Sequence, residues 1–190
     1  MLILIAGLVL FLGTHSFTMF RGARGGAISL VGPRYYRLSY TIKSLAGLAL
    51  IIWGFHRYRY GGWLEVWFPP LWLHHLTFLL MWPAFISLAC MNPAPSRIRG
   101  WLRHPMLAAI KFWALAHLLA NGDLGGILLF GSFLAWAVAD RIAVKKRGDL
   151  GAPRIGHFTR ADIQALAFGS IAYVLMIVLH PYLIGVPVLG

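Results

Sequence analysis

One stretch of the chain places a histidine in the middle of an apolar segment. The stretch is RHPMLAAIKFWALAHLLANGD, Arg103–Asp123, and the histidine is His117. An unpartnered imidazole is costly in an apolar environment, so it needs a hydrogen bond or a metal. With about 100° of rotation per helical residue, Trp113, Ala114 and Asn121 lie on the same helix face as His117. Because Ala114 is small, we expect it to leave room for a flat cofactor beside the imidazole.

A second histidine, His15, lies in GTHSF, late in the first apolar segment. Two histidines on different apolar segments, with no cysteine or carboxylate in either one, are typical of axial ligands of a haem iron. Zinc is less favoured, because the few acidic residues lie near segment ends or in loops. The single cysteine, Cys90, excludes a disulfide within the chain, and no C-x-x-C-H motif occurs, so we expect a non-covalent haem b. The alternative for His117 is an interhelical hydrogen bond without a cofactor.

The other polar residues of these segments are expected at helix ends or at the membrane surface. His104 precedes Pro105 and should cap a helix. Lys111 is the only Lys or Arg deep in an apolar segment. We expect Lys111 to support the bundle, to pair with Asp140, or to bind an anionic haem propionate. The remaining histidines are expected in loops or near headgroups: His56, His74, His75, His157 and His180.

The composition indicates an integral membrane protein. Of the 190 residues, 59% are hydrophobic and only 12% are charged, and the mean hydropathy is +0.74. A soluble domain of this size could not bury that much apolar surface. We therefore expect one all-α domain over residues 1–190, a polytopic bundle of about six transmembrane helices. The expected spans are Leu2–Phe20, Tyr40–His56, Leu71–Met91, Pro105–Asn121, Gly125–Ala143 and Asp162–Val186.

Short patterns predict where some of these helices begin and end. Pro105 suits the first turn of a helix, where its missing N–H is not needed. Asn121 and the glycine after it predict a helix end. Thr159 and Asp162 form a capping-box pattern that predicts the start of the last helix.

The positive charge follows the order of the loops. The formal net charge is +12, and Lys and Arg gather in the loops after the first, third and fifth spans. Of the 17 Lys and Arg residues, only Arg57, Arg59 and Lys111 lie elsewhere. This positive-inside pattern predicts those loops in the cytoplasm and both termini on the non-cytoplasmic side. It also accounts for the charge without nucleic-acid binding. Three tryptophans fit an interfacial belt on the outer side: Trp63, Trp67 and Trp72.

The chain resembles the NnrU family of membrane proteins. RHPMLAAIKFWALAHLLANGD followed by ILLFGSFLAWAVADR is similar to the core of that family, and GTHSF and GFHRYR upstream also fit it. The resemblance extends from the first span through the fifth. The family includes bacterial proteins tied to nitrite and nitric oxide respiration, and the plastid 15-cis-zeta-carotene isomerase. It implies a multi-pass protein of the bacterial inner membrane.

The isomerase branch of that family binds haem b through two histidines. The resemblance implies that His15 and His117 are the corresponding ligands here. The resemblance also matches His56 and His104 to two other histidines of the isomerase branch, and neither of these is the expected ligand. Ala114 stands where the isomerase branch has a cysteine, three residues before the second ligand, so chemistry that needs this thiol is in doubt.

The expected depths of the two ligands differ. At 1.5 Å per residue, His15 lies about 8 Å from the cytoplasmic side and His117 about 6 Å from the outer side. In a core of about 30 Å, their depths differ by roughly 15 Å. Helix tilt would close this gap. If it does not, the second ligand is one of the histidines expected on the outer side: His74, His75 or His180.

Three functions are therefore considered. The first is a haem b protein that supports nitrite or nitric oxide respiration, that is, denitrification. The second is an enzyme, a haem-dependent cis-trans isomerase of a lipid-soluble polyene such as zeta-carotene. The third is a structural membrane subunit without a cofactor. The expected partners are membrane lipid, nitric oxide or a polyene, and a second copy or a respiratory complex, but no nucleic acid.

Overall fold

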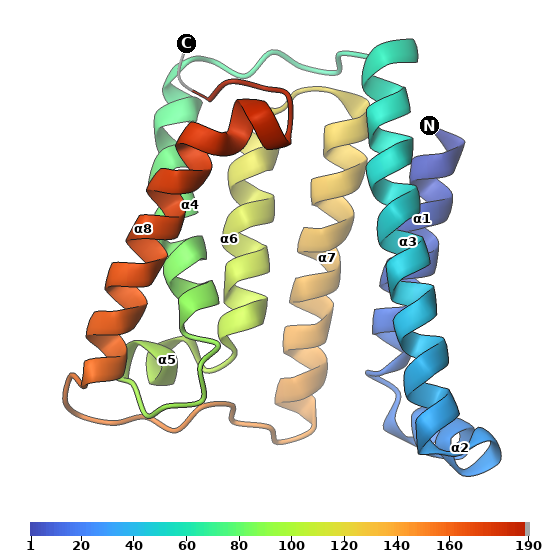
Figure 1. Cartoon of the computed structure of the whole chain (residues 1–190), viewed down its shortest axis with the longest axis vertical. Coiled ribbons are helices and arrows are strands. Elements are labelled where there is room, and N and C mark those ends of the chain that lie inside the picture. The colour runs from blue at the N-terminus through green and yellow to red at the C-terminus, as the bar shows by residue number, and fades with distance from the viewer. Residues whose placement is uncertain (189–190) are drawn as a thin grey trace.

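A computed structural model of the chain describes residues 1–188, and these residues fold into helices joined by short connections (Figure 1). The only strand-like pairing among them is an isolated bridge between Glu65 and Asp123. The helices are α1 (Leu2–Phe17), α2 (Arg21–Val31), α3 (Pro33–Gly61), α4 (Trp72–Ala89), α5 (Arg97–Leu102), α6 (Pro105–Ala120), α7 (Leu124–Lys146) and α8 (Arg160–Leu183).

Each of the six expected spans overlaps one of these helices, but the length and composition of the helices do not support six spans. Four helices are long and apolar enough to cross a membrane: α3, α4, α7 and α8. α1 and α2 together would make a fifth, although they are bent by 93° at the break between them. α6 is apolar but has 16 residues, about 24 Å at 1.5 Å per residue, which is shorter than a core of about 30 Å. The chain is thus an all-helical protein with four or five candidate spans.

The three helix ends predicted from short sequence patterns are confirmed, whereas other ends differ: α3 begins at Pro33 and not at Tyr40. Pro105 is in the first turn of α6, and Asn121 is the residue that follows its last turn. Thr159 and Asp162 form the capping box of α8. The sequence did not predict that Asp123 begins α7, where its side chain accepts a hydrogen bond from the Gly126 N–H at 2.8 Å.

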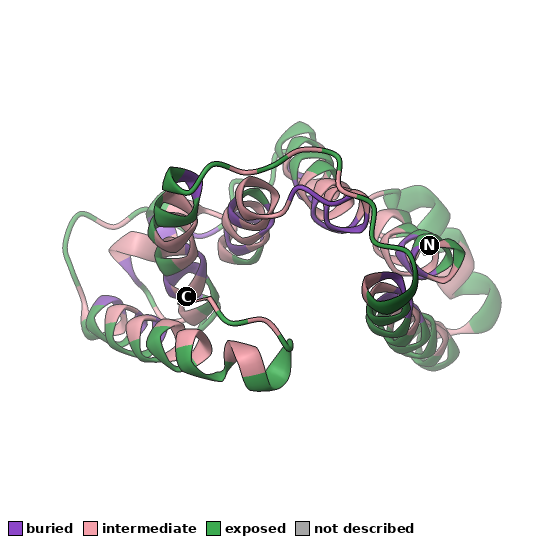
Figure 2. Cartoon of the chain, turned by 90° about the horizontal axis from the view of Figure 1, so that it is seen from above, coloured by how far each residue is buried: buried purple, intermediate pink, exposed green. Residues whose placement is uncertain are grey.

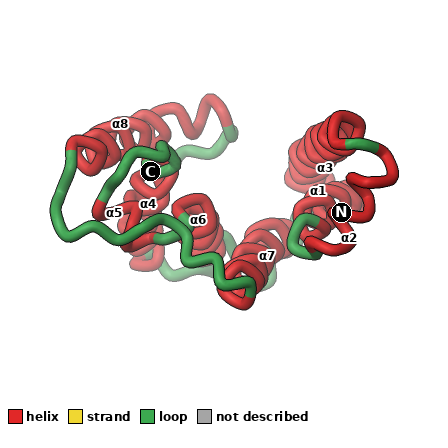
Figure 3. The backbone as a smooth tube through the Cα atoms, turned by 90° about the horizontal axis from the view of Figure 1, so that it is seen from below, coloured by secondary structure: helices red, strands yellow, loops and turns green. Residues whose placement is uncertain are grey.

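The long helices follow one another around an arc (Figure 2). α8 packs on α4, α4 on α6, α6 on α7, α7 on α1 and α1 on α3. α7 therefore joins the α1–α3 pair to the rest of the protein, and residues of α1 and α6 can meet only at its surface. Seen from the opposite end, α2 and α5 lie at distant parts of the same arc (Figure 3).

Three glycines bring α1 and α3 into close contact. A Cβ atom added to Gly7 would lie 2.6 Å from the Ile51 nitrogen, and one added to Gly47 would lie 2.8 Å from the Phe11 nitrogen. A Cβ on Gly54 would overlap the backbone of Leu4. In lipid the hydrophobic effect does not drive helices together, so helix packing depends on close van der Waals contact. Small residues allow this contact because they let two helix backbones approach. The close approach of α1 and α3 depends on these three positions.

The two ends of the bundle differ in charge. α2, α5 and the connection from α7 to α8 lie at one end, and the N-terminus and the end of α8 lie at the other (Figure 1). The segments rich in Lys and Arg lie at the α2 end, but Arg21, Arg24, Arg34 and Arg37, expected in a loop, lie in helices α2 and α3. This arrangement agrees with the loop pattern of the sequence, whereas the side of the membrane on which each end lies stays a prediction.

Reporter fusions test that prediction. A reporter at the C-terminus and one inserted after Lys146 should give opposite answers, with the second in the cytoplasm, because the basic connections resist transfer across the membrane. Activity of a cytoplasm-specific reporter at both positions would contradict the expected orientation.

Candidate functional site

His117 lies near the end of α6, with its ring held against aromatic side chains. Its Nδ1 atom is 2.8 Å from the Trp113 carbonyl oxygen, one helical turn earlier. The ring stacks on Phe130 of α7, with centroids 4.6 Å apart and an angle of 27°. Because a carbonyl oxygen can only accept, Nδ1 must carry the hydrogen. In the neutral ring this leaves Nε2 as the free lone pair, the tautomer that binds a metal through Nε2.

His15 has the same local arrangement on α1. Its Nδ1 atom is 2.7 Å from the Phe11 carbonyl oxygen, again one turn earlier. The ring stacks on Phe11 with centroids 4.2 Å apart. Tyr40 of α3 and Trp136 of α7 lie at 5.4 and 5.9 Å. Each imidazole by itself therefore fits an axial ligand, with one nitrogen anchored to its own helix and the other free.

The structure does not bring these two histidines into contact with each other. They are connected through other rings: Phe11 contacts Phe133 at 5.7 Å, and Phe133 contacts Trp113 at 5.5 Å. On α7, His15 lies beside Trp136 and His117 beside Phe130, which are six residues apart, or about 9 Å along the helix. Two imidazoles on one metal place their nitrogens roughly 4 Å apart, since each bond is about 2 Å. His15 and His117 therefore lie at different depths in the bundle, as expected from the sequence.

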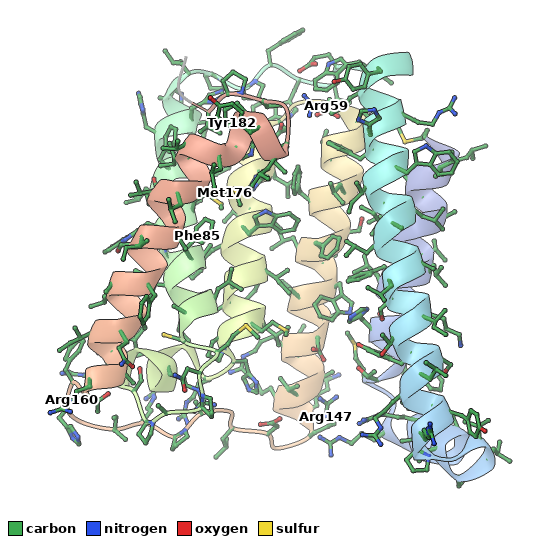
Figure 4. The ribbon with its side chains drawn as sticks, in the orientation of Figure 1. Arg59, Phe85, Arg147, Arg160, Met176 and Tyr182 are labelled. Carbon is green, nitrogen blue, oxygen red and sulfur yellow. The ribbon has the colours of Figure 1, made fainter. Side chains whose placement is uncertain are left out.

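His180, one of the alternative ligands, lies at the same end of the bundle as His117 (Figure 1). It is in the last turn of α8, and its Nδ1 atom is 2.7 Å from the Val186 carbonyl oxygen. Arg59 of α3 donates a hydrogen bond to the Ile184 carbonyl oxygen at 3.1 Å, which ties the segment after α8 to the far end of the arc (Figure 4). The other two alternatives, His74 and His75, are exposed at the start of α4.

Two residues beside His117 do not have the expected roles. Ala114 is 0% exposed and is part of a packed apolar cluster with Leu4 of α1 and Phe130 of α7. The expected room for a cofactor beside Ala114 is therefore filled by side chains. The Asn121 amide donates to the His117 carbonyl oxygen at 2.7 Å. It caps the end of α6 and does not accept from the imidazole, because the backbone of Trp113 already has that role.

The remaining polar candidates lie away from His117. Lys111 is half-buried on α6, in the half of the helix that follows its N-cap residue, His104. His104 Nε2 is buried without a hydrogen-bond partner. His56 lies on α3 with its ring 4.7 Å from Tyr60. Within residues 1–188, no three His, Cys, Asp or Glu side chains are grouped as a metal site would require.

An apolar pocket shares two of the rings that connect the histidines. It lies between α4, α6 and α7 and has a volume of about 270 Å³. Trp113 and Phe133 form one wall, and Phe85 of α4 forms part of the other (Figure 4). The lining contains no charged residue, so the pocket suits an apolar molecule that enters from the membrane.

The sequence identified Asp162 only as a capping residue and missed its contacts with the start of α5. Its carboxylate is 0% exposed and accepts from the Ser96 hydroxyl at 2.6 Å and the Ile98 N–H at 2.8 Å. It also accepts from the Arg97 and Thr159 N–H groups. The capping-box pattern predicted only the contact with Thr159, because Ser96 lies 66 residues away in the chain.

Fold and site together define a helical membrane protein that carries two histidines among aromatic rings inside its bundle. Its family follows from the comparison with known proteins. The chain belongs to the NnrU family, since the family model described as NnrU protein matches residues 3–188, nearly the whole chain. No curated protein and no solved structure matches it. The resemblance drawn from the histidine-containing motifs is thereby confirmed at the level of the family.

Proposed function

We propose that this NnrU protein binds haem b in the inner membrane, with His117 as an axial ligand, and supports nitrite or nitric oxide respiration. The observation that carries the proposal is the state of the His117 ring. Its Nδ1 is anchored on the Trp113 carbonyl oxygen, its Nε2 is free, and its surroundings are aromatic. A bound haem would supply an iron that exchanges electrons or binds nitric oxide. The protein's own part is to fix the imidazole and to exclude water.

The second ligand is assigned to His15, on the resemblance to the isomerase branch and on its matching anchor to the Phe11 carbonyl oxygen. Bringing both nitrogens to one iron requires α1 and α6 to shift along α7, because their contacts on α7 are six residues apart. His180 is the competing ligand, because it lies at the same end of the bundle as His117.

A second function, isomerisation of a lipid-soluble polyene, is supported by the apolar pocket next to Trp113. An extended hydrocarbon could lie there within reach of the His117 side of α6. The alanine at position 114 removes the thiol of the isomerase branch, which favours the respiratory function. Conversion of a cis-carotene by the reduced, purified protein would reverse that preference.

The haem content of the purified protein tests the proposal. Expressed with an adequate haem supply, the protein should carry about one haem b per chain, measured as the pyridine haemochrome. A protein that folds and melts cooperatively but carries no haem would leave His15 and His117 as packing residues of a structural subunit.

Absorption spectra of two variants then assign the second ligand. His15→Ala should convert a six-coordinate low-spin spectrum to a five-coordinate one or release the haem, whereas His180→Ala should keep the wild-type spectrum. The reverse pattern would move the second ligand to α8.

A further inference from the structure

A second pocket lies at the opposite end of the bundle from His117, in the corner formed by α1, α2 and α3. Its volume is about 270 Å³. α2 runs across the end of α1 at 93°, and none of its residues is buried. A short amphipathic helix that turns sharply away from a span is typical of one lying in the plane of the membrane surface. The pocket is therefore expected at the level of the lipid headgroups.

The pocket has one apolar side and one polar side. Phe17 of α1 and Ala27 and Val31 of α2 form the apolar side. Tyr36, Tyr40 and Lys43, which follow one another at helical spacing on α3, form most of the polar side. An occupant must therefore present a polar group to α3 and a hydrocarbon to α1 and α2.

The polar side offers hydrogen-bond donors that the protein does not use. The Tyr36 hydroxyl, which lines the pocket, is buried without a partner. A buried polar group without a partner is costly and marks a place where a ligand can bind. The Arg24 guanidinium lies over the Tyr36 ring, 5.9 Å from its centre, and adds a positive charge next to the pocket.

The charge of this corner is not balanced within its own helices. The first acidic residue of the chain is Glu65, beyond the far end of α3, whereas Arg21, Arg24, Arg34, Arg37 and Lys43 all precede it. None of the residues lining the pocket is acidic. Basic side chains without a carboxylate partner at the membrane surface attract anionic headgroups.

We propose that this pocket binds one anionic phospholipid. Its phosphate accepts hydrogen bonds from the Tyr36 hydroxyl and the Lys43 ammonium, with Arg24 nearby, and one acyl chain lies against Phe17 and Val31. A free phosphate ion would use only the polar side, and a neutral phospholipid would leave the charge of Lys43 and Arg24 unbalanced. The bound lipid fixes the angle between α1 and α2.

Titration of phospholipid against the delipidated protein in detergent tests this proposal. Phosphatidylglycerol and phosphatidylcholine of equal chain length are compared by native mass spectrometry and by the rise in melting temperature. Lys43→Gln should weaken binding of phosphatidylglycerol about tenfold, as expected for the loss of one charge-assisted hydrogen bond. Tyr36→Phe should weaken it several-fold. Arg57→Gln, at the other end of α3, is the matched control and should bind as the wild type does.

Three results would overturn the proposal. They are equal affinity for the two lipids, wild-type affinity in both Lys43→Gln and Tyr36→Phe, and the same thermal protection by inorganic phosphate alone. Lys43→Arg keeps the charge and should retain most of the affinity, which separates loss of the site from loss of the fold. None of these variants replaces a residue in contact with His117, so the haem content should not change and this test is independent of the function proposed for His117.

Discussion

Replacing Asp162 with alanine is expected to destabilise the protein by about 3 kcal/mol or more, because several buried donors lose their only acceptor. The carboxylate is fully buried and joins the start of α8 to the start of α5. Without it, water must enter this junction or the two helix ends must separate. The donors left without it are the Ser96 hydroxyl and the N–H groups of Arg97, Ile98 and Thr159.

Thermal unfolding in detergent measures this effect. Asp162→Asn keeps the shape but replaces one acceptor oxygen with a donor, so it should fall between the wild type and Asp162→Ala. Asp149→Ala removes an exposed carboxylate that accepts a single hydrogen bond, from the Gly151 N–H, and should change stability by about 1 kcal/mol or less. Equal melting temperatures of Asp162→Ala and Asp149→Ala would show that the junction does not hold the fold together.

Adding a single methyl group at Gly54 is expected to force α1 and α3 apart. The new Cβ atom would overlap the Leu4 nitrogen and Cα, and backbone atoms cannot move aside as the end of a side chain can. Overpacking of this kind costs about 1–3 kcal/mol. Because α1 packs on both α3 and α7, a shift of α1 also displaces His15 from Trp136.

The control for Gly54→Ala is Gly131→Ala in α7, where an added Cβ meets nothing within 4 Å. Alanine is the better helix former, so Gly131→Ala should leave stability unchanged or raise it by about 0.5–1 kcal/mol. If Gly54→Ala were as stable as Gly131→Ala, the backbones of α1 and α3 would have to lie farther apart than they do in this structure.

Three helix ends were predictable because each is marked by a local feature of the sequence. Pro105, Asn121 and the Thr159–Asp162 pair each act on the nearest turn, so a short window of sequence contains the whole interaction. The number of spans was not predictable in the same way. α1 ends at Phe17 and turns sharply into α2, and α6 is only 16 residues long.

The individual residues of the candidate site were predictable, but their arrangement in space was not. Helical periodicity placed Trp113 beside His117, and the structure has their rings 5.4 Å apart. It could not show that the space beside Ala114 is filled by residues such as Leu4, which comes from another helix. Nor could it show that α7 separates His15 from His117, because the order of helices around the arc depends on long-range packing.

The absorption spectrum of purified His117→Ala is the most direct test of haem binding at this histidine. His56→Ala is the matched control, since His56 is also a histidine on a long helix but lies against Tyr60, away from the aromatic cluster. The wild type and His56→Ala should both show the Soret and α bands of a haem b, and His117→Ala should lose most of that absorbance while remaining folded. Full haem occupancy with an unchanged spectrum in His117→Ala would contradict the assignment of His117 as an axial ligand.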